Sequence, residues 1–309
     1  EPSGNPYRLT RHGSNVFFHA TTLENGVELW RTNGTNEGTA LVSDICKELR
    51  PNPPSSPHNL VGVGNTLYFV ARDFDHGNEL WRTVDTEARV EMVKDIFQGS
   101  AGSDPHHLTA VGPILYFGAD DGTNGNELWR SDGTEAGTRL VQDYAPTQSN
   151  SSPKELTMYK DTLYFVAWNE RDGEELRMVV GTAIHRVKDI YPGPASSNPR
   201  ELVVVGDGLY FRANDGAHGE ELWGSWGAEY NTHMVRDILP RSTASTIPAW
   251  LTPLERKLFF VASDGTRGLE LWSIESAGAR PAMVADIARG PGEGLLIVNK
   301  LDDRRSETR

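Results

Sequence analysis

The tripeptide Glu-Leu-Trp recurs along this 309-residue chain and limits its possible folds more than any other feature. It begins at Glu28, Glu79, Glu127, Glu221 and Glu270, and a degenerate copy, Glu-Leu-Arg, begins at Glu175. About 15 residues after each copy comes Asp-Ile or a variant of it, at Asp44, Asp95, Asp143, Asp189, Asp237 and Asp286. A repeat of about 48 residues with several short apolar runs per copy is typical of a β-propeller.

Each repeat divides into four short apolar runs, which we interpret as β-strands. In the clearest copy, residues 104–144, the expected strands are His107–Val111, Ile114–Ala119, Asn126–Arg130 and Thr138–Asp143. Gly, Pro, Asp and Asn separate the runs, as turns require, and no apolar stripe of helical period accompanies them. The sequence therefore predicts an all-β fold, a six-bladed β-propeller with four antiparallel strands per blade around a central channel.

The repeat also sets the expected domain boundaries. Residues 1–301 form one predicted propeller, and residues 302–309 form a charged tail. A surplus apolar segment, residues 294–298, is expected to act as a closing strand, since an uncovered sheet edge invites aggregation. The predicted blades are residues 5–45, 57–96, 104–144, 152–190, 198–238 and 246–287.

Composition narrows the kinds of partner. The net charge is −13, which disfavours nucleic acid, because phosphate binding needs a basic face. No apolar run reaches the roughly 18 residues of a membrane span. The chain begins at Glu1 without Met, which suits a mature protein after removal of a signal peptide. We expect a monomer that is secreted or on the bacterial cell surface.

The best-preserved repeat, Asn126 to Thr138, reads Asn-Glu-Leu-Trp-Arg-Ser-Asp-Gly-Thr-Glu-Ala-Gly-Thr and resembles the unit of the ELWxxDGT-repeat proteins. The resemblance extends over roughly residues 5 to 287. It implies a propeller of secreted or surface-bound bacterial proteins, and it implies no catalytic motif. The Asp-Gly-Thr turn is altered in the second, fifth and sixth copies, and the fourth has lost both this turn and the Trp.

The repeated residues are most simply explained as scaffold. The Glu of each copy is expected to cap backbone N–H groups of the preceding glycine-rich loop, because buried donors need acceptors. A Ca²⁺ or sugar site in each blade, with Asp121 and Asn124 beside Glu127, is the alternative. The Asp of Asp-Ile is expected to anchor one blade to the next, and the Trp to pack between blades.

Functional residues should instead break the repeat where the innermost strands begin. The residue before the first-strand Leu varies between copies, with five residue types at six positions: Arg8, Asn59, His107, Glu155, Glu201 and Trp250. The residue before that also varies, with His in two copies: Tyr7, His58, His106, Lys154, Arg200 and Ala249. The ends of the second strands add His19, Arg72, Trp168 and Arg212. Loops and strand ends on a rigid scaffold are common places for binding groups.

Three chemistries fit this set of residues. Glu155 and Glu201 come from adjacent blades, and two carboxylates about 5–10 Å apart are the apparatus of glycoside hydrolysis. The histidines His58, His106 and His107 could ligate Zn²⁺ or another divalent metal, with Glu155 completing a site that activates water.

In the third chemistry, arginines bind the carboxylate of an acidic sugar and Tyr7 or a histidine abstracts a proton, as in a lyase. The expected catalytic residues are thus Glu155, Glu201, His107 and Tyr7. The expected substrate-binding residues are Arg8, Asn59, Arg72, Trp168, Arg200, Arg212 and Trp250. Alternatively, these charges only pair with one another.

The preferred function at this point is a hydrolase or lyase with one asymmetric site for a carbohydrate-like substrate over the channel. A non-catalytic module that recognises a glycan or a protein is the alternative. A multivalent lectin would repeat its binding residues in every blade, which this chain does not do.

Overall fold

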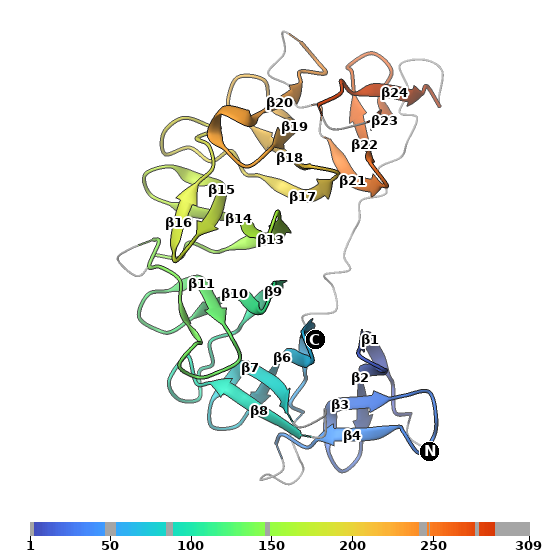
Figure 1. The fold of residues 1–309 in the computed structure, drawn as a ribbon, viewed down its shortest axis with the longest axis vertical. Coiled ribbons are helices and arrows are strands. Elements are labelled where there is room, and N and C mark those ends of the chain that lie inside the picture. The colour runs from blue at the N-terminus through green and yellow to red at the C-terminus, as the bar shows by residue number, and fades with distance from the viewer. Residues whose placement is uncertain are drawn as a thin grey trace. The chain divides into compact units, whose positions relative to one another are not determined.

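The computed structural model describes residues 3–46, 54–84, 89–145, 149–240, 246, 248–275 and 278–287. The chain divides into two compact units, Glu1–Glu170 with Arg177–His185, and Arg171–Leu176 with Arg186–Arg309. Within the described residues the fold is all-β and consists of six four-stranded antiparallel sheets (Figure 1). The closing strand expected at residues 294–298 and the tail at 302–309 lie outside the described residues.

The six sheets are built alike, each from four strands that are consecutive in the chain. The first three sheets contain β1 (Tyr7–His12), β2 (Asn15–Thr22), β3 (Gly26–Thr32), β4 (Ala40–Ser43), β5 (His58–Val63), β6 (Thr66–Asp73), β7 (Gly77–Val84), β8 (Arg89–Lys94), β9 (His106–Val111), β10 (Ile114–Asp120), β11 (Asn126–Ser131) and β12 (Arg139–Leu140). The last three contain β13 (Lys154–Tyr159), β14 (Thr162–Asn169), β15 (Gly173–Val180), β16 (Ala183–Arg186), β17 (Arg200–Val205), β18 (Gly208–Asn214), β19 (Glu220–Ser225), β20 (Thr232–Arg236), β21 (Ala249–Leu254), β22 (Lys257–Ser263), β23 (Leu269–Ile274) and β24 (Ala282–Ala285).

The repeat predicted this strand pattern. Every copy of Glu-Leu-Trp, and its degenerate form, lies in the third strand of its sheet. The fourth strand of the third sheet is shorter than expected, because β12 pairs with β11 only at Arg139 and Leu140. The one helix among the described residues is a single 3₁₀ turn at Glu229–Asn231.

Within each unit, hydrophobic core lies between consecutive sheets. Trp129 is buried in a cluster that contains Leu115 and Phe117 of its own sheet and Tyr68 and Leu80 of the sheet before it. Trp272 is buried in the same way among residues of the fifth and sixth sheets. The predicted role of this Trp in packing between blades is therefore confirmed at both positions.

The first strands of neighbouring sheets lie side by side within each unit. In the first unit β1 lies beside β5, β5 beside β9 and β9 beside β13; in the second unit β17 lies beside β21. The starts of these strands, where the candidate functional residues stand, are thus brought close together within each unit.

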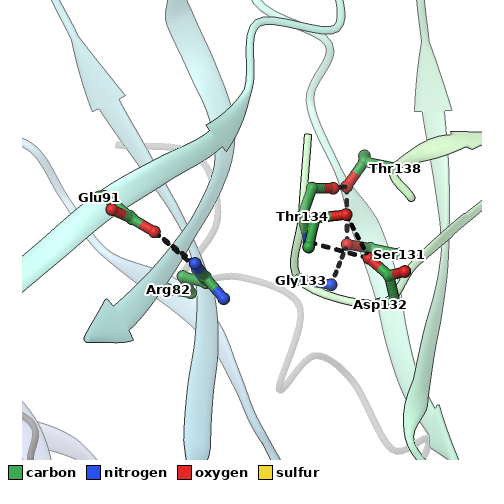
Figure 2. Close-up of polar contacts among 7 residues, drawn as sticks. All are labelled: Arg82, Glu91, Ser131, Asp132, Gly133, Thr134 and Thr138. Carbon is green, nitrogen blue, oxygen red and sulfur yellow. Dashed lines mark hydrogen bonds and ion pairs between the residues drawn. The ribbon is translucent and has the colours of Figure 1, made fainter. Parts of the chain in front are cut away.

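The Asp-Gly-Thr turn between the third and fourth strands is held by its own side chains (Figure 2). Asp132 accepts hydrogen bonds from the backbone N–H and hydroxyl of Thr134, at 2.9 and 2.7 Å. Ser131 and Thr138 close the turn through a 2.7 Å bond between their hydroxyl groups. Gly133 has φ +92°, and a Cβ there would collide with the hydroxyl of Tyr68 in the preceding sheet, so this turn requires glycine. This repeated turn is scaffold.

The repeated Glu caps backbone donors, as predicted, but its donors lie elsewhere than expected. Glu127 is fully buried and accepts hydrogen bonds from the backbone N–H groups of Tyr144, Ala145 and Ser151 and from the Ser151 hydroxyl at 2.6 Å. These donors lie in the connection that leads to the next sheet, not in the preceding loop. The carboxylate therefore ties the third strand of one sheet to the approach of the next.

The same Glu–Ser or Glu–Thr bond recurs along the chain. The pairs are Glu28–Ser55, Glu79–Ser103, Glu127–Ser151, Glu175–Ser197 and Glu221–Thr246. Burial raises the pKa of Glu28, Glu79 and Glu221 to about 7, and the hydrogen bonds oppose this only in part.

Candidate functional site

Six residues at equivalent places share an unusual backbone conformation. Each is the residue before the first-strand Leu, and each has φ between +53° and +56°, in the left-handed region: Arg8, Asn59, His107, Glu155, Glu201 and Trp250. Among these residue types Asn and His are enriched in that region, and for Arg, Glu and Trp it costs about 1 kcal/mol or more. These are the six residues that the sequence singled out as breaking the repeat.

A β-bulge causes this conformation. In the first sheet Tyr7 pairs with His19, but the next pair is Thr10 with Phe17, so β1 contains an extra residue here. The other five first strands show the same shift in register at the same place. A bulge re-aims a side chain relative to the regular strand. The scaffold thus presents six side chains of five chemical types on one repeated backbone.

Basic and aromatic side chains from the first and second sheets lie close together. The rings of Tyr7 and His19 meet edge to face with centroids 4.9 Å apart. His19 is only 1% exposed, and its Nε2 has no hydrogen-bond partner among the described residues. Burial, together with the nearby Arg8 and His58, lowers the pKa of His19 to about 4, so its ring is neutral at physiological pH.

The histidines expected to bind metal do not assemble into a triad. His58 and His106 each turn Nδ1 towards a backbone carbonyl two residues earlier, at 3.0 Å. His107 follows His106, with the two rings edge to face at 5.2 Å. Among the described residues no group of three His, Cys, Asp or Glu side chains is arranged to hold a metal ion.

In the fifth sheet the charged candidate residues Arg212 and Glu201 form an ion pair. Nε of Arg212 lies 3.8 Å from Glu201 and 3.6 Å from Glu220, and its Nη1 donates to the carbonyl of Pro248 at 3.4 Å. Glu201 also accepts the backbone N–H of Leu251 at 2.9 Å. Here the alternative that charges pair with one another describes the geometry well. Glu220 was not among the sequence candidates.

The structure separates two groups that the sequence treated as one. His19 and Arg212 pair directly with first-strand residues, Tyr7 and Arg200. Arg72 and Trp168 lie two positions further along their strands, where their backbone N–H groups donate to Ser55 and Ser151. Arg72 and Trp168 therefore do not belong to the same layer as His19 and Arg212.

Glu155 belongs to the first unit and Glu201 to the second, so their pairing as acid and base stays a prediction.

Cys46 is buried, its thiol donates to the carbonyl of Arg72 at 3.2 Å, and burial raises its pKa to about 11. Both observations disfavour Cys46 as a nucleophile, since the reactive form is the thiolate.

Neither a protein-family model nor a curated protein sequence matches this chain. Among solved structures, it is similar to a puromycin hydrolase S511A mutant complexed with PGG, at 16% identity and a TM-score of 0.49 over 94% of this chain and 46% of that one. The chain thus spans about half the length of that hydrolase.

Two further solved structures show similar values. The β-propeller domain of the Trilobed protease from Pyrococcus furiosus has an open velcro topology and matches at 10% identity and a TM-score of 0.46, over 92% of this chain and 86% of that one. The computationally designed Ika8 protein matches at 16% identity and a TM-score of 0.46, over 90% of this chain and 74% of that one. In this chain, no helix within the described residues has the length and apolar character needed to cross a membrane.

Proposed function

We propose that the six sheets close into a six-bladed propeller in which the sixth blade meets the first. Support comes from the repeated Glu of the sixth sheet. Glu270 is fully buried, accepts the N–H of Ile287 at 2.9 Å, and has no partner for Oε1 among the described residues. In the other sheets the matching Glu bonds to a residue three positions before the next first strand. Before β1 that residue is Gly4, and its carbonyl accepts the N–H of Thr21 just as Ser55 accepts that of Arg72.

The function that fits this architecture is the binding of one carbohydrate-like ligand at the end of the channel where the inner strands begin. One observation carries it: a repeated bulge presents Arg8, Asn59, His107, Glu155, Glu201 and Trp250 on equivalent backbones. A scaffold role alone gives no reason to place Arg, His, Glu or Trp in the left-handed conformation at five of the six equivalent positions. Secretion or surface location, a monomeric state and use outside the cell belong to the same proposal.

A lyase is the enzyme version that a specific observation favours. A neutral, buried His19 with an unpartnered Nε2 beside Tyr7 and Arg8 has the character of a base next to a carboxylate site. In such a reaction the proton on the carbon next to the carboxylate passes to the base. The C–O bond one carbon further breaks, and the departing sugar oxygen takes up a proton, leaving an unsaturated acid. The glycosidase version is weaker, because Glu201 is already engaged by Arg212 and by Leu251.

Screening the full chain against a glycan array tests the binding proposal. Wild type should bind a restricted set of glycans, and Trp250→Asn should lose that binding while keeping its Tm. Leu254→Asn, at an exposed position on the same strand beyond the bulge, is the control and should bind normally. Equal binding by wild type and both variants, or no glycan bound by any of them, would refute the proposal.

A further inference from the structure

The bulge residues differ in how their charges are balanced. In the fifth sheet, Arg212 lies between two carboxylates, so that part of the ring is neutralised by its own neighbours. Arg8 has no carboxylate partner among the described residues and is exposed. The chain has a net charge of −13, so carboxylates are plentiful, yet none among the described residues pairs with Arg8. It suggests that the acid comes from a ligand.

The surroundings of Arg8 define the ligand further. His58 commits its Nδ1 to the carbonyl of Ser56, which leaves its Nε2 for a ligand. His19 adds a second Nε2 that is buried and unpartnered, and a buried polar atom without a partner is costly. The charged groups that help to lower the pKa of His19 are Arg8 and His58, and neither is a carboxylate.

An aromatic ring completes the group. Tyr7 packs edge to face on His19 and remains 41% exposed, so its ring is available to a ligand beside Arg8. β1 and β5, which carry Tyr7, Arg8 and His58, lie side by side. A guanidinium, two imidazole nitrogens and an exposed ring suit a pyranose that carries a carboxylate.

We propose that Tyr7, Arg8, His19 and His58 form a carboxylate-binding subsite that selects uronic-acid residues. This inference rests on the proposed function and specifies its ligand. Arg8 pairs with the carboxylate, His58 and His19 bond to neighbouring hydroxyl groups, and Tyr7 lies against the sugar ring.

Calorimetric titration of the full chain tests this subsite. The probes are the trisaccharides of galacturonate, mannuronate and glucuronate, their methyl esters, and hexaglutamate as a carboxylate source without a sugar. Wild type should bind at least one acidic trisaccharide at least 10-fold more tightly than its methyl ester. Arg8→Asn should weaken that binding by about 10- to 100-fold, the usual range for a lost charge-assisted hydrogen bond. Asn already occupies the equivalent position in the second sheet as Asn59, with the same backbone conformation.

Arg11→Asn is the matched control, because Arg11 is exposed on the same strand beyond the bulge and its loss changes the net charge equally. It should leave binding unchanged. Equal affinity for acids and esters with no effect of Arg8→Asn overturns the subsite but leaves the proposed function standing. Binding of hexaglutamate alone, or of none of these probes, also overturns the subsite. The glycan array, with its own variants, tests separately whether the protein binds a glycan at all.

Discussion

The guanidinium of Arg177 lies over the ring of Tyr144, 5.2 Å from its centroid. Arg177 replaces the repeated Trp in the fourth sheet and is fully buried. Its Nε donates to the carbonyl of Ala167 at 3.4 Å, as Nε1 of Trp272 does to Ala262 at 3.0 Å. Tyr144 in turn replaces the Ile of Asp-Ile in the sheet before. Two departures from the repeat are thus one compensated change, in which a stacked cation and ring take the place of packed Trp and Ile.

This pairing predicts strong coupling between the two positions. In the preceding interface the equivalent residues are Ile96 and Trp129, which pack in one cluster. Arg177→Trp alone should destabilise the fold, because Tyr144 is larger than Ile and leaves too little space for a Trp. Tyr144→Ile alone should also destabilise, since it leaves a buried cation without its ring. The double variant should recover most of the loss, with a coupling energy of about 1 kcal/mol or more in denaturant unfolding. Simple additivity would contradict the pairing.

Truncation of the repeated Trp should cost most where it is buried between sheets. Trp129→Ala is expected to lower the free energy of unfolding by roughly 3–5 kcal/mol, as for other large core truncations. Ligand affinity of the folded fraction should stay unchanged, because Trp129 lies in the cluster between the second and third sheets. The checks are urea unfolding and calorimetry on the same samples, and a large loss of affinity at normal stability would show that the Trp row binds ligand.

Gly4→Ser tests closure of the ring. Gly4 lacks a positive φ, and a Cβ there would meet nothing nearer than the carbonyl of Thr21 at 3.8 Å, so a side chain fits. If the sixth blade meets the first, the new hydroxyl can bond to Glu270, as Ser103 bonds to Glu79 at 2.6 Å. The stability gain should be about 1–2 kcal/mol. Gly4→Ala should lack this gain, and the gain should vanish in a Glu270→Ala background; an equal gain from Ser and Ala would contradict closure at this seam.

Stability should fall as pH rises through neutrality. The pKa of Glu28, Glu79 and Glu221 is raised from 4.5 to about 7, mainly by burial. A raised pKa means that the folded form holds the proton more tightly than the unfolded form. This contribution is therefore fully present below pH 4.5 and is lost as pH rises through about 7. Thermal unfolding between pH 5 and 8 measures the slope.

Glu79→Gln provides the control for that slope. Gln can accept the N–H groups of Phe97 and Ser103, which now bond to Glu79 at 3.1 and 2.9 Å, and can donate to the Ser103 hydroxyl. It does not titrate, so the fall in Tm from pH 5 to 8 should become smaller. An unchanged or steeper fall would show that the buried carboxyl groups do not cause it.

The sequence predicted the sheets well because repeated local patterns determine them. Gly, Pro and Asp mark the ends of the strands, and the same four runs recur with Glu-Leu-Trp always in the third. The bulge was not predictable, because left-handed residues are normally signalled by Gly or Asn, and Arg8, Glu155 and Trp250 are neither. The site residues were found by a different route, from their variation between copies.

The grouping of second-strand residues failed because the sequence does not show which residue of the second strand faces the first. Arg72 was grouped with His19, but Val70, two residues before Arg72, pairs with His58 as His19 pairs with Tyr7. The partners of the repeated Glu were also misplaced. They lie 24 residues away in the chain for both Glu79–Ser103 and Glu127–Ser151, and local sequence does not report such a contact.

His19→Val is expected to separate stability from function. The position equivalent to His19 is Val70, Val166 and Val261 in three other sheets, so the fold accepts Val there. Val also removes a buried Nε2 that has no partner among the described residues, which should stabilise the protein by about 1 kcal/mol. If His19 serves the ligand, the same change should weaken binding of the acidic trisaccharide selected by titration. Differential scanning calorimetry and titration on one preparation measure both effects. A variant that is less stable than wild type but binds normally would show that His19 is part of the core and not of the site.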